Sequence, residues 1–212
     1  MKSLARVLRG NLLIFTLGDS VRQLSYFITF PYFSLYVQAL GGSTVQIGLV
    51  NSLLPLAALF TYPIAGYLSN RYSRVKIIAI SGYVSAALLS IFMLARDWRF
   101  LAFGNFLMGL MVFQFPSMNS LMADSLPSHQ RGVGYSLWIA IPSVIGIVSP
   151  YIGGYLITIL GVEQAMRILY GWSIIATVGI ATVNLRFLQE TETGKGKVAF
   201  GRGALSILSD SY

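Results

Sequence analysis

Six apolar runs, each long enough to cross a lipid bilayer, place the strongest constraint on how this chain can fold. They cover approximately residues 11–38, 44–68, 75–95, 98–124, 133–160 and 165–188. A hydrocarbon core about 30 Å thick is crossed by roughly 20 helical residues. The runs are too long for barrel strands and do not alternate between apolar and polar residues, so each predicts a helix. The sequence therefore predicts an all-α membrane protein with six spans.

The composition agrees with lipid as the solvent for most of the chain. Apolar residues make up 55% of the 212 residues and charged residues only 10%, whereas soluble domains carry about 25% charged residues. The basic and then apolar N-terminal region resembles a signal peptide. However, its apolar run meets Asp19 without a small-residue cleavage site, which predicts an uncleaved first helix.

The distribution of basic residues predicts the orientation in the membrane. With the N-terminus in the cytoplasm, most of them fall on the cytoplasmic side: Lys2, Arg6, Arg9, Arg71, Arg74, Lys76, Arg131, Arg186, Lys195, Lys197 and Arg202. Only Arg96, Arg99 and Arg167 fall outside, as the positive-inside rule expects. We therefore expect a multi-pass protein of the cell membrane with both termini cytoplasmic. The net charge of +8 does not indicate a nucleic-acid partner, because no basic face is joined to a soluble core.

Recurring proline and glycine positions indicate an internal repeat. The second run contains PLAALFTYPIAGYL from Pro55, and the fifth contains PSVIGIVSPYIGGYL from Pro142. Phe-Pro at 30–31 also recurs at 115–116, and the paired positions lie between 85 and 89 residues apart. A unit of three spans is odd, so the second copy would be inverted, a plan that recurs in secondary transporters. The alternative is that proline and glycine are simply common in membrane helices.

The loop after the second run resembles the signature of the major facilitator superfamily of membrane transporters, roughly G-x-L-x-D-R-x-G-R-[RK]. The matching residues are Gly66, Leu68, Arg71 and Arg74, with Lys76 just beyond. Asn70 replaces the family aspartate and Ser73 the second glycine. Asp124 and Arg131, after the fourth run, match a second family loop. The resemblance implies a cytoplasmic latch between two halves of a transporter, in which Asn70 could still cap a helix end. The alternative is that the cations only set the topology.

The fifth run resembles the family's antiporter signature, G-P-x-x-G-G, with Ser149 in place of the leading glycine. Pro150 removes a backbone donor and permits a bend, while Gly153 and Gly154 allow another helix to approach closely. The resemblance implies export of small molecules in exchange for an ion, commonly a proton. A tightly packed, kinked helix in any transporter is the alternative. The fourth run keeps only Gly109 of the exporters' R-x-x-Q-G pattern, which puts proton coupling in doubt.

Two charges inside the first run identify the candidate binding surface. A charge at the bilayer centre costs about 2.5–3.5 kcal/mol, so it usually faces a cavity or a partner. Asp19 and Arg22 are neighbours on one helical face. Burial would favour the protonated carboxyl and Arg22 the carboxylate, so a proton-exchanging site and a permanent structural pair both stay open. Tyr26 and Phe33 continue the same stripe of the first helix. The resemblance implies that the first and fourth helices line the central cavity, which adds Asn105, Phe115 and Asn119 of the fourth helix as candidates.

The resemblance covers about residues 10–190 and implies one half of a transporter. We expect a six-helix bundle over 1–188 and the start of a cytoplasmic linker over 189–212, with a second six-helix half in the same gene product or another chain. The glycine-rich sides of the second and fifth helices should then be open and apolar.

We expect ion-coupled export of small organic molecules by alternating access, with H⁺ or Na⁺ as the coupling ion. Uptake of a sugar, peptide or organic acid, with Arg22 binding an anionic group, is one alternative, and a non-transporting membrane scaffold is another. No nucleophile–base pair predicts an enzyme, and the single histidine, His129, lies in a loop. We therefore expect no catalysis, cofactor or metal.

Overall fold

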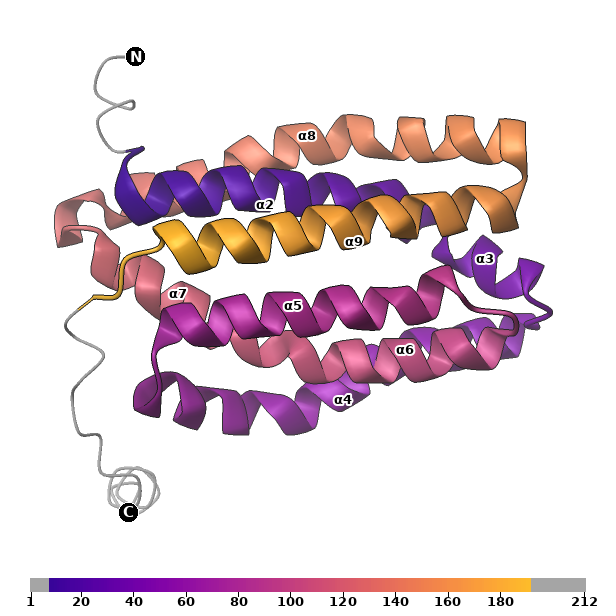
Figure 1. Cartoon of the computed structure of the whole chain (residues 1–212), viewed down its shortest axis with the longest axis horizontal. Helices are drawn as coiled ribbons and strands as arrows, with labels where there is room; N and C mark the ends of the chain where they lie inside the picture. The colour runs from indigo at the N-terminus through magenta and orange to yellow at the C-terminus, as the bar shows by residue number, and fades with distance from the viewer. Residues whose placement is uncertain (1–7, 192–212) are drawn as a thin grey trace, which may run out of the picture.

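The computed structural model describes residues 8–191, and of residues 66–71 it describes the backbone alone. Every regular element in that part of the chain is helical (Figure 1). The elements are α2 (Gly10–Thr29), η1 (Phe30–Tyr32), α3 (Phe33–Ala39), α4 (Thr44–Arg71), α5 (Arg74–Met93), α6 (Trp98–Leu110), η2 (Met111–Phe113), α7 (Gln114–Ser125), η3 (Ser128–Gln130), α8 (Arg131–Leu160) and α9 (Val162–Phe187). The predicted all-α class is confirmed for the described residues.

Five helical stretches within residues 8–191 are long and apolar enough to cross a membrane. They are Thr44–Ala65, Arg74–Met93, Trp98–Ser125, Ser128–Leu160 and Val162–Phe187. The first predicted span, now α2 to α3, is not among them. Its buried residues include Asn11, Thr16, Asp19 and Ser20, and these polar groups lower its hydropathy. The first span, and with it the total of six, therefore stays a prediction.

Two of the predicted runs are interrupted by a 3₁₀ turn, η1 in the first and η2 in the fourth. η1 contains the first Phe-Pro pair, and η2 lies just before the second. Proline has no N–H, so Pro31 leaves the carbonyl of Phe27 without its helical donor, and Pro116 does the same to Val112. Tighter hydrogen bonding over one turn is a common local response to such a loss. Elsewhere the predicted boundaries agree with the helices to within three residues.

The helices pack side by side along one axis (Figure 1). α2 lies between α8 and α9, and α9 also packs along α5. α4 packs against α6, η2 and α7. The first helical segment of the chain therefore contacts the fifth, while the fourth contacts the second.

Two clusters of buried apolar side chains lie at opposite ends of the bundle. One, around Tyr36, Phe92 and Tyr170, joins α3, α5 and α9, and the Tyr36 hydroxyl donates to the Phe92 carbonyl at 2.9 Å. The other, around Phe15 and Leu121, joins α2 and α7. We call the second end the Arg74 end, because α5 begins there with Arg74, and the first the Trp98 end, where α6 begins.

Candidate functional site

Asp19 lies near the middle of α2 and is buried. Its Oδ1 accepts a hydrogen bond from Nε of Arg22 at 2.9 Å, and its Oδ2 accepts one from the indole N–H of Trp138 on α8. A carboxylate removed from water is tolerated when it is paired and hydrogen-bonded. Both oxygens of Asp19 are therefore occupied by donors of the bundle itself.

Arg22 is the more accessible partner of the pair. Its side chain is 46% exposed, and its guanidinium carbon lies 5.7 Å from the centroid of the Phe115 ring, within range of a cation–π interaction. The pair borders a cavity of about 270 Å³ between α2, α7 and α8. The cavity is lined by Asp19, Arg22, Gln23, Phe115, Met118, Asn119, Tyr135, Trp138, Ile139 and Pro142. Because both oxygens of Asp19 already accept hydrogen bonds, the guanidinium of Arg22 is the charged group that this cavity offers to a ligand.

Four predicted site residues come together at this cavity: Asp19, Arg22, Phe115 and Asn119. The sequence did not predict that α8 contributes side chains to this cavity, above all Trp138. A signal for it existed, because a tryptophan in a membrane helix needs an acceptor for its N–H when it is not at the lipid interface. Nothing local, however, indicates that the acceptor is 119 residues away.

The other three predicted residues do not line the cavity. Tyr26 is exposed and stacks on Phe30, with ring centroids 4.8 Å apart. Phe33 follows the η1 turn, which breaks the stripe of α2, and packs in the Trp98-end cluster. Asn105 is buried and donates its amide to the carbonyl of Val50 at 2.7 Å, which ties α6 to α4.

The predicted latch residues have different surroundings at the Arg74 end. Nη1 of Arg74 donates to Oδ2 of Asp124 at 2.6 Å, which joins α5 to α7, and the Arg74 side chain is only 8% exposed. Nε of Arg131 donates to the carbonyl of Leu126 at 3.3 Å. Lys76 is exposed.

The prediction that Asn70 caps a helix is wrong for the start of α5. The backbone of Gly66, Asn70 and Arg71 belongs to the end of α4, and their side chains lie outside the described residues. The N-cap of α5 is Ser73, whose hydroxyl accepts from the backbone N–H of Lys76 at 3.3 Å. Serine is a favoured N-cap residue, so the family's glycine position has become the cap.

Glu190, which the sequence did not single out, closes the first turn of α5 from outside. Its Oε2 accepts from the Ser73 hydroxyl at 2.6 Å and from the backbone N–H of Val75 at 3.3 Å. Its Oε1 accepts from the backbone N–H of Arg74 at 3.2 Å. A carboxylate at a helix N-terminus satisfies orphan donors and complements the helix dipole.

Pro150, Gly153 and Gly154 lie on the face of α8 that contacts α2 and η1. The Tyr32 hydroxyl donates to the Pro150 carbonyl at 2.7 Å, and a Cβ at Gly153 would overlap the Ile28 carbonyl. The prediction that the glycine-rich side of the fifth helix is open is therefore wrong. That side is packed within the bundle.

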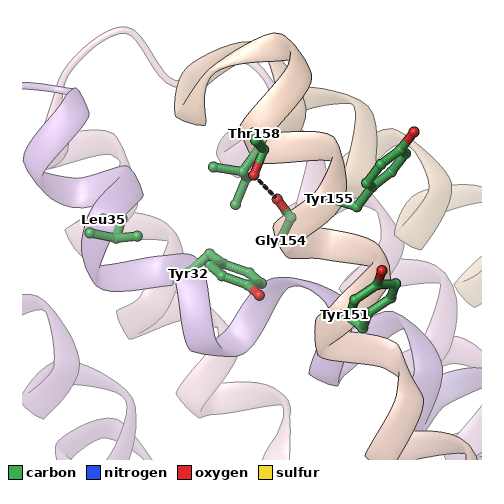
Figure 2. Close-up of a pocket in the computed structure, with 7 residues that line it drawn as sticks. Tyr32, Leu35, Tyr151, Gly154, Tyr155 and Thr158 are labelled. Carbon is green, nitrogen blue, oxygen red and sulfur yellow. Dashed lines mark hydrogen bonds between the residues drawn. The ribbon is translucent and has the colours of Figure 1, made fainter.

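A second cavity, of about 430 Å³, lies beside this contact (Figure 2). Figure 2 shows the Tyr32 ring between Leu35 and Gly154, while Tyr151 and Tyr155 project from α8. Its lining residues carry no charge. The Asp19 cavity is therefore the one of the two that joins a charged pair to an apolar space.

The family comparison agrees with this architecture. The family model described as the Major Facilitator Superfamily matches residues 15–210. The chain belongs to this superfamily. Membership makes it a multi-pass membrane protein, in agreement with the five membrane-capable helices among the described residues.

The curated relatives of this superfamily member carry names of resistance and efflux proteins. The multi-drug resistance efflux pump PmrA of Streptococcus pneumoniae is 22% identical over 175 residues, covering 80% of this chain and 44% of the relative. The multidrug resistance protein MdtG of Yersinia enterocolitica is 30% identical, covering 70% and 37%. The quinolone resistance protein NorA of Staphylococcus aureus is 24% identical, covering 61% and 34%. The chain spans less than half the length of these relatives.

At the Arg74 end of this superfamily member, Asn11 connects three helix ends. Its amide donates to the Ser125 hydroxyl and the Gln189 carbonyl, and its carbonyl accepts from the Gln189 N–H, each at 2.8 Å. α2, α7 and the segment after α9 therefore meet at one side chain, and no other described residue joins these three by hydrogen bonds.

We expect Asn11→Leu to lower the free energy of unfolding by about 1–3 kcal/mol, because a buried donor or acceptor left unsatisfied costs that much. Gln38→Leu, which removes an exposed amide near the Trp98 end, is the control and should change stability little. Thermal melting of the purified protein in detergent measures both variants. Equal melting temperatures for Asn11→Leu and the unsubstituted protein would show that the three-way connection contributes nothing.

Proposed function

We propose that the chain is one half of a secondary active transporter that exports small organic molecules in exchange for an ion, by alternating access. The carrying observation is the buried Asp19, bonded to Arg22 and Trp138 at the edge of a cavity between the first, fourth and fifth helical segments. An ionisable residue inside a membrane segment usually marks a substrate or ion pathway. The names of the relatives, efflux pump and multidrug resistance protein, support the direction of transport.

We propose six spans arranged as two inverted triplets. Two features of the structure support this proposal. The first segment of each triplet is interrupted by a 3₁₀ turn at or next to a Phe-Pro pair. The second segment of each holds two prolines, Pro55 and Pro63 in α4 and Pro142 and Pro150 in α8. The packing also agrees with two related triplets. The first segment of the first triplet, α2, contacts the second segment of the other, α8. In the same way, α6 and α7, which begin the second triplet, contact α4 of the first. Inverted repeats of this kind place substrate sites near the midplane.

We further propose that a second six-helix half, from the same gene product or another chain, completes the transporter. Residues 1–188 would be the first bundle and 189–212 the start of the linker, of which 192–212 lie outside the described residues. α8 also exposes apolar side chains, including Val144, Ile147, Val148 and Tyr151. These, and the exposed Leu59 and Phe60 of α4, provide surface for the second half or for lipid.

The Arg74 end would face the cytoplasm in the cell membrane, because Arg74, Lys76 and Arg131 lie there. In this orientation the Arg74–Asp124 pair belongs to the cytoplasmic latch between the halves. Ser73 and Glu190 would hold the start of α5 in place for it, without the family aspartate at position 70. The latch side chains at 66–71 remain part of this proposal on the sequence alone.

Transport of a fluorescent fluoroquinolone by the complete gene product in proteoliposomes tests the proposal, since one relative is named for quinolone resistance. Vesicles with a pH or a sodium gradient identify the ion. We expect Asp19→Asn to slow gradient-driven export at least about tenfold, because a charge-assisted hydrogen bond contributes about 1.5–3 kcal/mol. Asp97→Asn, which alters an exposed carboxylate at the Trp98 end, should retain transport.

Two results would contradict this function. No movement of the probe under either gradient, with Asp19→Asn changing only the folding yield, would favour a scaffold. Inward movement driven by a proton gradient, lost in Arg22→Gln and seen only for anionic compounds, would favour an uptake permease.

A further inference from the structure

We propose that Trp138 is a positioning residue that couples the charge of Asp19 to the conformation of α8. The inference rests on the proposed function, with a proton as the exchanged ion and Asp19 as the group that binds it. It adds the route by which that proton alters the bundle. A transporter needs such a route, because a proton on one side chain changes a conformation only if the two conformations bind it differently.

The first observation is the bond itself. The indole N–H of Trp138 donates to Oδ2 of Asp19, so α8 is held to α2 by a hydrogen bond whose acceptor is charged only while Asp19 is ionised. Aromatic neighbours fix the indole, with the ring centroids of Phe15 at 5.8 Å and Tyr135 at 5.6 Å. Hydrogen bonds to ionised groups are roughly twice as strong as neutral ones. Protonation of Asp19 therefore weakens this contact between the two helices.

The second observation is where the bond joins α8. Pro142 lies four residues after Trp138 and has no N–H, so the Trp138 carbonyl lacks its helical donor. Proline is a common cause of helix bending. Trp138, which bonds Asp19 through its side chain, is thus also a residue whose carbonyl lacks its helical donor, and the side-chain bond joins α8 to α2 at one of the two turns that a proline weakens. Pro142 is itself buried and lines the same cavity.

The third observation is the small number of charges around Asp19. Among the cavity residues, Arg22 on α2 is the other charged group and Tyr135 on α8 the other titratable one. α7 contributes Phe115, Met118 and Asn119, none of which ionises near neutral pH. α9 faces α2 at Gly18 with Ile180 and Asn184, which are also uncharged.

The proton balance is simple. One proton from solution binds the Asp19 carboxylate and gives a neutral carboxyl, so the indole N–H loses its ionised acceptor and Arg22 loses its counter-charge. The first turns of α8, up to Pro142, are then free to move away from α2. Release of the proton restores both bonds.

Distance measurements between spin labels test this inference, and the absence of native cysteines makes them direct. Labels at Val133→Cys on α8 and Ile80→Cys on α5 use two exposed positions. In lipid nanodiscs at neutral pH we expect Trp138→Phe and Asp19→Asn to shift the distance distribution in the same direction. The double variant should shift it no further, because the two changes remove one interaction. Trp172→Phe, at an exposed tryptophan of α9, should leave the distribution unchanged.

Fluorescence provides a second readout that leaves Trp138 intact. In the variant Trp98→Phe/Trp172→Phe the remaining indole of these 212 residues is Trp138. We expect its emission maximum to change with Asp19→Asn and, as pH falls, only when Asp19 is present. An unchanged emission in Asp19→Asn, or additive shifts of the label distance, would overturn the inference. Neither measurement involves transport. A change in the label distance without any transport would contradict the proposed function alone. Transport that depends on Asp19, with no change in the Trp138 emission, would contradict this inference alone.

Discussion

Asp124→Asn should lower the free energy of unfolding by about 3 kcal/mol or more, because removing one partner of a buried ion pair leaves an uncompensated charge. Arg74 has only 8% of its side chain exposed and Asp124 21%. The Nε of Arg74 is buried, and no group among the described residues accepts a hydrogen bond from it. Asp124 is therefore the main group that compensates this guanidinium, and asparagine keeps the size of the side chain while it removes the charge.

The matched control is Asp97→Asn, in an exposed pair. Nε of Arg99 lies 4.0 Å from Oδ1 of Asp97, and their side chains are 80% and 48% exposed. Exposed pairs contribute about 0–1 kcal/mol, so this variant should change little through its charge. Thermal melting in detergent at constant salt compares the two. If the two asparagine variants melt alike, the Arg74–Asp124 pair does not stabilise the Arg74 end.

Gly153→Ala is the second substitution for which we expect a large loss of stability. A methyl group there would overlap the backbone carbonyl of Ile28 and press on the ring of Tyr32. The Ile28 carbonyl is part of the α2 backbone, so it can make room for the methyl group only if α2 and α8 move apart. Overpacking of this kind typically costs about 1–3 kcal/mol and sometimes more, and it would also disturb the Asp19 cavity that the same two helices border.

Gly179→Ala provides the comparison within the same bundle. Gly179 is helical, in α9, and a Cβ there would meet no heavy atom within 4 Å. Alanine is a better helix former than glycine by about 1 kcal/mol, so this variant should be neutral or slightly stabilised. Equal melting temperatures for the two alanine variants would show that α8 and α2 are packed less closely than the structure indicates.

The two substitutions probe contacts that serve different parts of the proposed mechanism. Gly153 lets α8 lie against α2, and the same pair of helices forms the Asp19–Trp138 bond. Asp124 holds α7 to the first turn of α5, where Ser73 and Glu190 meet. In the proposed transporter the first contact carries the response to a proton and the second belongs to the latch.

The sequence determined the helices, because a helix closes its hydrogen bonds within four residues and its length is set by the apolar run. The two charges of the first run and the cations of the signature loop were equally legible. The breaks at η1 and η2 are not part of that prediction, because an apolar run does not show where one of its turns will tighten.

The tertiary structure decided which side chains meet. Asp19 and Trp138 are separated by 119 residues, and Ser73 and Glu190 by 117. Such contacts depend on how each helix is rotated and which neighbour it packs against, and close glycine contacts such as Gly153 on Ile28 settle that. The sequence assigned Phe33 to the Asp19 stripe, whereas the turn at η1 directs it into the Trp98-end cluster. Helices follow from local energetics, but the site follows from packing between segments that the sequence keeps far apart.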